Sequence, residues 1–251
     1  KCYWKKFLEL SQGGTAVGSG INAHKQFAKL FAQEITKLTK NKYKFTPAKN
    51  FYHELSAQDC SVQLSGELKN LAVILMKISN DLRWMNSGPL AGISEIELKA
   101  LQPGSSIMPG KVNPVIPEAV AMASADVIGN DVSITVAAQS GNFQLNVMLP
   151  VIAYNLLKSI NLLSGSMNAL SKNAIKTFKV NHKNLETSLS KNPILVTALN
   201  PLVGYEKAAS IAKKAYKENR PIIDVAAEET DLAKSELIKL LNPSKLAKGG
   251  L

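Results

Sequence analysis

The hydrophobic pattern of this chain is that of long helices. From Leu64 onward apolar residues recur in alternating steps of four and three, at Leu64, Leu68, Leu71, Leu75, Ile78, Leu82 and Met85. This is the heptad spacing of a helix that packs lengthwise against its neighbours. We therefore predict one long bundle helix here, with a stripe that stabilises the fold and takes no part in chemistry.

A second segment, from Val132 to Leu157, contains no charged residue. Polar side chains nevertheless interrupt it, at Ser133, Gln139, Asn142, Gln144, Asn146 and Asn155. A membrane span is therefore disfavoured, and a helix buried on all sides explains the segment better. Because one chain of this size seldom surrounds a helix completely, we expect other subunits to cover part of it.

The pattern changes near residue 183, where we place the start of a small helical domain. Asn192-Pro193 and Asn200-Pro201 interrupt the chain, and shorter helices are expected at Glu206–Glu218, Ile222–Glu228 and Ser235–Leu241. The predicted fold is all-α. It has a long-helix domain over residues 1–182 and a small C-terminal domain over residues 183–251.

Composition and charge narrow the class of protein. The chain has 251 residues, of which 45% are hydrophobic and 20% charged, enough to bury a sizeable core. Its net charge of +11 comes from 28 lysines and only two arginines, Arg83 and Arg220. Nucleic-acid binders favour arginine for phosphate and base contacts, so nucleic acid is not an expected partner. A mildly positive field would instead help to collect a small dianion.

The cysteines and histidines indicate neither a disulfide nor a metal site. Cys2 and Cys60 lie far apart, and His24, His53 and His182 lack the spacing of a ligand cluster. Each histidine is expected at the surface or as a helix cap. We predict no metal and no cofactor.

Two further segments bear on the location of the protein and on nucleotide binding. The first residues, KCYWKKFLEL, resemble neither a secretory signal nor a transit peptide, so a reducing, cytoplasmic location is expected. GGTAVGSG, from Gly13 to Gly20, lacks the Gly-Lys-Ser/Thr ending of a phosphate-binding loop and follows no strand. We interpret it as a turn between helices.

The candidate chemistry lies in PGSSIMPGKVNPVIP, from Pro103 to Pro117. Glycine and proline prevent regular structure up to Gly110, so a loop is expected that could close over a ligand. Asn113 is a good N-cap and Pro114 suits the first helical position, so a helix should begin within a turn of Lys111. A helix N-terminus beside a lysine favours an anionic ligand. An exposed loop with solvated side chains is the alternative for any one of these residues.

This loop resembles the third signature of the fumarase/aspartase superfamily, GSSxMPxKxN, at all seven fixed positions from Gly104 to Asn113. Further stretches are similar to class II fumarate hydratase: Gly13–Asn22, Lys77–Gly92, Val127–Val147 and Leu195–Ala215. The resemblance covers nearly the whole chain after about residue 8. Aspartate ammonia-lyase, a member of the same superfamily, is the runner-up.

The resemblance implies a role for each matched residue. Ser105 is expected to abstract a proton beside a substrate carboxylate, which gives an aci-carboxylate intermediate. Glu118 is expected to pair with a catalytic histidine. Ser106, Lys111, Val112 and Asn113 are expected to bind the substrate, a small dicarboxylate such as fumarate or malate. The family fold is a long-helix bundle that assembles as a homotetramer.

The same resemblance implies that this chain is a partial subunit. The two other active-site signatures and the histidine partner of Glu118 would precede Gly13, and none of His24, His53 or His182 stands in the matching context. The isolated chain is therefore expected to show little hydratase activity. A non-catalytic helical assembly fragment stays open as the alternative to an enzyme.

Overall fold

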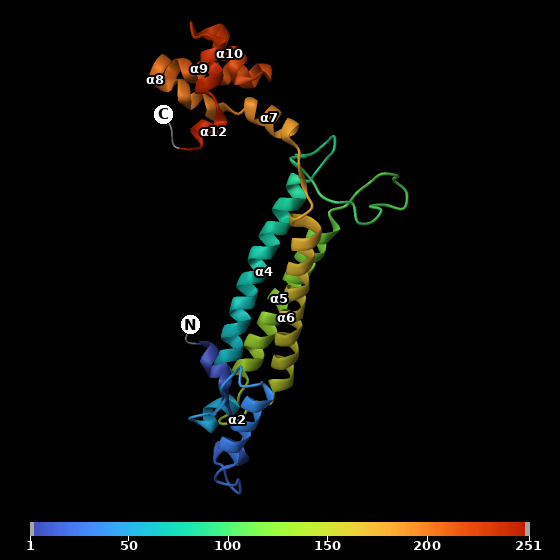
Figure 1. The fold of residues 1–251 in the computed structure, drawn as a ribbon, viewed down its shortest axis with the longest axis vertical. Coiled ribbons are helices and arrows are strands. Elements are labelled where there is room, and N and C mark those ends of the chain that lie inside the picture. The colour runs from blue at the N-terminus through green and yellow to red at the C-terminus, as the bar shows by residue number, and fades with distance from the viewer. Residues whose placement is uncertain (1–2, 249–251) are drawn as a thin grey trace. The chain divides into compact units, whose positions relative to one another are not determined.

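The computed structural model describes residues 3–248, which are mostly helical (Figure 1). The chain divides into two compact units, each described separately below. The long-helix unit comprises residues 1–84 and 98–178, and the short-helix unit comprises residues 85–97 and 179–251. The predicted all-α fold is confirmed, whereas the domain boundary predicted after residue 182 stays a prediction.

The predicted bundle helix is α4, Asp59–Met85. Its buried residues are Ser65, Ala72, Leu75, Ser79 and Leu82. The predicted stripe was therefore partly wrong, because Leu64, Leu68, Leu71 and Ile78 are only half-buried within this chain. Leu75 and Leu82 of the stripe are buried as predicted, and Ser65, Ala72 and Ser79, seven residues apart, form a further buried line, since small side chains let a neighbouring helix approach closely.

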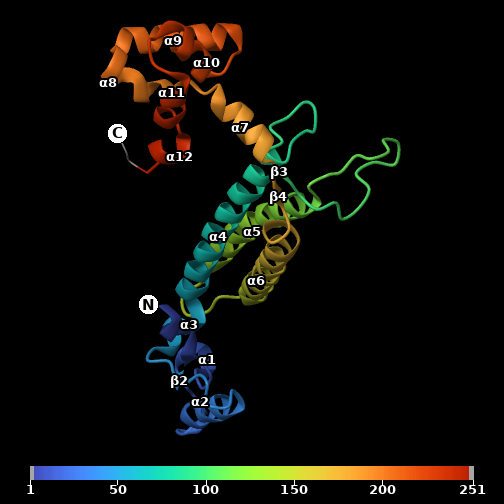
Figure 2. The same ribbon diagram turned by 45° about the horizontal axis from the view of Figure 1, so that its top comes forward.

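Two further long helices, α5 (Val115–Gln139) and α6 (Leu149–Leu170), pack against each other along their lengths. Together with α4 they form the bundle seen in both ribbon views (Figures 1 and 2). The buried line of α5 also follows a heptad, through Pro117, Val120, Ser124, Val127, Asp131 and Ile134. Pro150 lies in the first turn of α6, where a missing N–H costs nothing.

The prediction of one fully buried helix between Val132 and Leu157 was wrong. The segment covers the end of α5, a turn, and the start of α6, because Ser140 and Gly141 end the first helix. Within this chain it is also largely exposed: Phe143 is 93% accessible and Val147 71%. Cover by other subunits stays a prediction.

Buried polar contacts fix α5 against both neighbours. Asp131 accepts hydrogen bonds from Ser65 Oγ at 2.7 Å and from Lys69 Nζ at 2.6 Å, both on α4. On the other side Asn130 Nδ2 donates to Ser159 Oγ of α6 at 3.2 Å. Because each bond needs one particular partner, these contacts specify the axial register that apolar packing alone leaves loose.

Length and composition alone would allow α5 to cross a membrane. A third of its apolar window is buried, and the helix carries Asp126 and Asp131, each paired with a lysine of a neighbouring helix. The ion pairs to both neighbouring helices are typical of a helix packed in a bundle, whereas two thirds of the window is not buried within this chain.

The N-terminal part of the long-helix unit consists of short elements. They are η1 (Tyr3–Leu8), β1 (Glu9–Leu10), α1 (Thr15–Gly18), α2 (Phe27–Leu38), β2 (Thr46–Pro47) and α3 (Phe51–Ser56), with β1 parallel to β2. The glycine-rich segment is irregular, with non-helical backbone angles at Ala16 and Val17, but it lies between β1 and α2, so the expectation that no strand precedes it was wrong. A Cβ at Gly18 would lie 2.7 Å from the backbone nitrogen of Tyr52, so this close approach requires glycine. At the other end α6 continues into the π-helical turn η2, Ser171–Ile175.

The short-helix unit begins with the antiparallel pair β3 (Ile96–Glu97) and β4 (Lys179–Val180). It continues through α7 (His182–Ser190), η3 (Pro193–Leu199), α8 (Asn200–Val203), α9 (Tyr205–Glu218), α10 (Ile222–Glu229), α11 (Lys234–Leu240) and α12 (Pro243–Leu246). The three predicted helices correspond to α9, α10 and α11 within one residue at each end. Their core includes Leu199, Ile211, Ile222 and Leu237, each inaccessible to solvent.

Ion pairs join α9 to α10. Lys214 and Lys207 donate to Glu229 at 2.6 and 3.0 Å. The hydrogen bond from Lys214, followed by that from Lys207, lowers the pKa of Glu229 to about 2. Arg220 forms a two-pronged contact with Glu228, which lowers the pKa of that carboxyl. The contact between these helices should therefore weaken in acid.

Replacing the buried carboxylate should destabilise the bundle. We expect Asp131→Ala to lower the free energy of unfolding by about 2–3 kcal/mol, because it leaves Ser65 without its partner and the Lys69 charge unpaired. Asp126→Ala is the matched control: Asp126 is 41% exposed and its pair with Lys158 should contribute less than about 1 kcal/mol. Denaturant unfolding measures both, and equal losses would contradict the role given to Asp131.

Acid should remove the contribution of Glu229. Its folded pKa of about 2 lies below the ordinary value of 4.5, so the stabilisation is complete above pH 4.5 and is lost as the pH falls toward 2. Glu229→Gln should therefore lower Tm near neutral pH but match the unsubstituted protein near pH 2. Glu186→Gln, at an exposed site on α7, should change Tm little at either pH. A pH-independent deficit in Glu229→Gln would contradict the assignment.

Candidate active site

The predicted site residues lie mainly on one loop of the long-helix unit. The loop comprises residues 98–114, leads into α5 and extends away from the start of that helix (Figures 1 and 2). Its irregular backbone is what two glycines and two prolines between Pro103 and Gly110 require.

A tight turn forms at residues 108–111 of the loop. Lys111 N donates to Met108 O at 3.3 Å, so Pro109 and Gly110 occupy the two central positions. Gly110 has a φ of +81°, which a type II turn needs at its third residue. The sequence Pro-Gly thus determines where the chain reverses direction before Lys111.

Ser105 directly follows the bend at Gly104 and is half-buried. Its Oγ accepts hydrogen bonds from the backbone N–H groups of Ile107 and Met108, both at 3.2 Å. Two donors aimed at one hydroxyl oxygen stabilise negative charge on it. Ser105 therefore has the kind of help that an ordinary serine hydroxyl lacks as a base.

Asn113 differs from its expected local role. The helix begins one residue later than predicted, at Val115, and Pro114 occupies the cap position without a side-chain bond. The Asn113 amide instead donates backwards to Gly104 O at 3.0 Å, because the loop ends lie within its reach. The N-cap prediction was wrong, although the helix does begin within a turn of Lys111.

The predicted substrate-binding residues differ in exposure. Ser106, Lys111 and Val112 are exposed, and Asn113 is half-buried. An exposed ammonium and a half-buried amide at the same end of α5 form an electropositive edge, to which the N-terminus of this 25-residue helix adds its partial charge. Such an edge favours a carboxylate over a neutral ligand.

Glu118 lies in the first turn of α5, half-buried. Its backbone N–H donates to Pro114 O at 3.1 Å, which ties the first turn of the helix to the end of the loop. Within residues 3–248 no ion pair engages the Glu118 carboxylate. His24, His53 and His182 are all exposed: His24 accepts from Gln26 N, and His53 Nε2 lies 3.4 Å from Asp59 Oδ2.

The structure brings Ser105, Lys111 and Asn113 together on one hydrogen-bonded loop and places Glu118 on the helix that follows. Sequence reasoning missed Gly104, whose N–H donates to Lys111 O at 2.8 Å and whose carbonyl accepts from Asn113. Its position as the first residue of the GSS string was the available signal. In the part of the chain that the structure describes, no three His, Cys, Asp or Glu residues lie together as a metal site would require.

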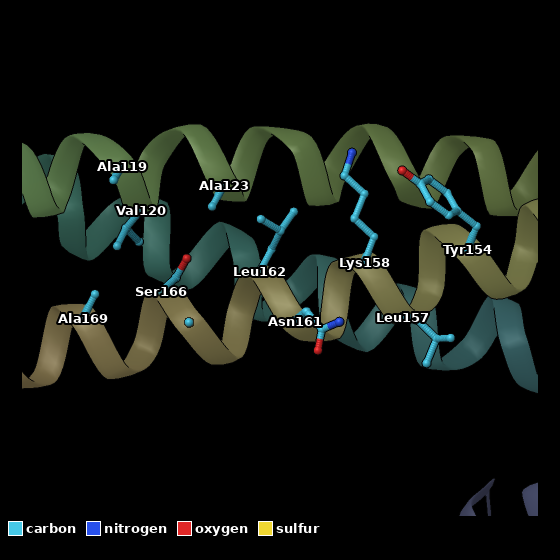
Figure 3. Close-up of a pocket in the computed structure, with 11 residues that line it drawn as sticks. Ala119, Val120, Ala123, Tyr154, Leu157, Lys158, Asn161, Leu162, Ser166 and Ala169 are labelled. Carbon is cyan, nitrogen blue, oxygen red and sulfur yellow. The ribbon is translucent and has the colours of Figure 1, made fainter.

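A groove of about 740 Å³ runs between α5 and α6, away from the loop residues (Figure 3). Ala119 and Ala123 of α5 and Leu162 and Ala169 of α6 contribute to its mostly apolar wall. Lys158 reaches across the groove to Asp126, and this hydrogen bond raises the pKa of the lysine. None of the predicted site residues lines this groove.

Comparisons with known proteins agree with the family resemblance. A family model described as lyase matches residues 3–129, about half of the chain, and one described as the C-terminus of fumarase C matches residues 195–248. A class II fumarate hydratase of Pseudomonas aeruginosa is 63% identical over 243 residues, which are 97% of this chain and 53% of that protein.

Solved structures show the same fold. A fumarate lyase:delta crystallin of Brucella melitensis has a TM-score of 0.91 at 40% identity and covers 98% of this chain and 53% of its own. A class II fumarase of Schistosoma mansoni has a TM-score of 0.88 at 33% identity, covering 98% and 54%. The chain thus spans about half the length of the relatives that it matches.

Proposed function

Because this chain belongs to the class II fumarate hydratase branch of the lyase family, we propose that it carries part of the active site of an enzyme that reversibly hydrates fumarate to (S)-malate. The observation that carries the proposal is the Ser105 hydroxyl, which accepts hydrogen bonds from two backbone N–H groups on the loop that also carries the exposed Lys111. The reaction class is that of a carbon–oxygen lyase.

The chemistry needs a base and an electropositive surface. Removing water from malate starts with loss of a weakly acidic proton from the carbon beside a carboxylate. The electron pair moves into that carboxylate, and the resulting aci-carboxylate carries two negative charges. Ser105 takes the proton in this proposal, since the N–H groups of Ile107 and Met108 favour its alkoxide over its hydroxyl.

Lys111 and Asn113 bind the substrate carboxylate, with the Val112 backbone between them and Ser106 as a further contact. Their donors act most strongly once the loop closes and excludes water, because electrostatic stabilisation grows as the local dielectric constant falls. Glu118 works with a histidine that assists the departing hydroxyl. Among residues 3–248 no ion pair or hydrogen bond joins the Glu118 carboxylate to a histidine, and the family resemblance assigns this role to a histidine of another signature.

Aspartate ammonia-lyase is the other reaction that the loop signature allows. The relatives named fumarate hydratase reach 63% identity, and the fold neighbour from Schistosoma mansoni is a class II fumarase. These findings favour water over ammonia as the second substrate. The expected cytoplasmic location stays part of the proposal, in keeping with the free thiol of Cys60.

Assembly as a homotetramer also belongs to this proposal. The groove between α5 and α6 has an apolar wall, and Tyr154 and Leu157 at its edge are 67% and 62% exposed. The leucines of α4 that are only half-buried form a second apolar surface that this chain does not fully cover. Burying such surfaces against other subunits supplies the cover that one chain lacks.

An assay of the chain together with the complementary part of a relative tests the activity. The chain is produced alone and together with the part of the Pseudomonas aeruginosa relative that it does not cover, and fumarate is supplied with and without ammonia. We expect malate from the combination, no aspartate, and little turnover by the chain alone. Aspartate as the main product would replace hydratase by ammonia-lyase, and no product from a correctly assembled combination would refute both.

Ser105→Ala tests the assigned base in the same combination. Loss of the proton acceptor should reduce kcat by about 10²–10⁴-fold, while assembly stays intact because the residue is remote from the bundle contacts. Gln102→Ala, an exposed residue of the same loop, is the matched control and should retain full turnover. Near-normal turnover in Ser105→Ala would remove that residue from its role.

The assembly proposal is tested by sedimentation of the chain and of Leu157→Glu. We expect an oligomer for the unsubstituted chain and a shift toward smaller species for the variant, because a carboxylate would be buried at the contact. Leu202→Glu, exposed on α8 and outside the groove, is the control. A monomeric chain in the presence of the relative's complementary part would contradict the proposal.

A further inference from the structure

Gly104 lies at the base of the candidate loop and has both of its backbone polar groups engaged. Its N–H donates to Lys111 O at 2.8 Å, and its carbonyl accepts from Asn113 Nδ2 at 3.0 Å. The two partners come from the far end of the loop. The first bond closes a ring of eight residues, Gly104–Lys111. The second attaches this ring to Asn113, two residues before the start of α5.

Space, rather than backbone conformation, makes glycine necessary at this position. The φ of Gly104 lies outside the left-handed region, so another residue could adopt its backbone angles. A Cβ would, however, lie 2.6 Å from Lys111 O and 2.8 Å from Lys111 C. These are backbone atoms, which cannot swing aside, so any side chain would separate the two ends of the loop.

The position of Ser105 depends directly on these bonds. The peptide group between Gly104 and Ser105 is planar, so holding the Gly104 carbonyl also fixes the direction of the Ser105 N–H and the position of the Ser105 Cα. The Ser105 Oγ then meets the N–H groups of Ile107 and Met108 inside the same ring. Opening the ring at its base would release all of these contacts together.

We propose that Gly104 and Asn113 form a clasp that closes the base of the loop and positions Ser105 for proton abstraction. Asn113 is thereby a positioning residue for Ser105 as well as a predicted substrate contact. The primary amide can serve both, because it has two N–H groups and only one is used by Gly104. The catalytic part of this inference rests on the proposed function, whereas the clasp itself does not.

Hydrogen exchange of the 251-residue chain tests the clasp without any activity. The Gly104 amide should exchange slowly in the unsubstituted chain. Asn113→Asp keeps the shape but replaces the donor by an acceptor, and Gly104→Ala inserts the Cβ, so each should speed exchange at residues 104–111 about tenfold or more. Gln102→Ala should not. Amides in the middle of α5 serve as the internal standard, and their unchanged exchange shows that the bundle is folded.

Two exchange results would overturn the clasp. One is a Gly104 amide that exchanges in the unsubstituted chain at the rate of an unstructured peptide. The other is Asn113→Asp or Gly104→Ala with unchanged exchange at residues 104–111. Gly129→Ala adds a methyl in α5 where no heavy atom lies within 4 Å, and it controls for the general effect of replacing glycine.

Kinetics in the combination with the relative's portion test the positioning role. Gly104 has no side chain with which to bind substrate, so a clasp predicts that Gly104→Ala lowers kcat at least tenfold and changes KM little. A rise in KM with unchanged kcat would overturn the positioning role. If the exchange results hold while Ser105→Ala remains active, Ser105 loses its role as the base and the clasp stands. If they hold while the assembled combination forms no product, the proposed function fails and the clasp stands.

Discussion

The buried carboxylate of Asp131 is the contact on which the arrangement of the long helices depends. It accepts from Ser65 and Lys69 of α4, and the adjacent Asn130 reaches Ser159 of α6. Small residues along the packed faces let the helices approach closely. They do not fix the position of one helix along the axis of the other, because a shift along the axis brings similar small side chains into contact. A polar side chain with one correct partner removes that freedom, because every other register leaves a charge or amide unpaired in the core.

A fixed α5 also gives the candidate site a fixed foundation. The helix begins at Val115, directly after the loop, and Glu118 projects from its first turn. The loop side chains are exposed or half-buried, so they gain little from packing and depend on hydrogen bonds for their arrangement. The type II turn at Pro109-Gly110 and the bonds of Gly104 supply them. The candidate site thus combines a rigid helix start with a loop that is held by its own hydrogen bonds.

The apolar surfaces of the long helices have a separate meaning. Heptad positions on α4 that the sequence assigns to the core are only half-buried within one chain, and the uncharged segment after Val132 is mostly accessible. A hydrophobic stripe predicts burial but does not say which chain supplies the cover. The proposal of an assembly with other subunits follows from this surplus. The short-helix unit differs in this respect. Its apolar residues on η3, α9 and α10 are buried within the chain itself, and the ion pairs of Glu228 and Glu229 lie outside that core.

The sequence by itself determined the helical class, the bounds of α9 to α11 within a residue, and the chemistry-bearing string from Gly104 to Asn113. Periodicity and Gly/Pro punctuation are local signals, so one chain segment is enough to read them. Tertiary structure alone decided that Asn113 bonds to Gly104 instead of capping α5, and that Ser65, Ala72 and Ser79 line the contact face of α4. Both outcomes depend on which atoms from positions far apart in the sequence lie close together in the fold. A local sequence pattern does not specify those distances.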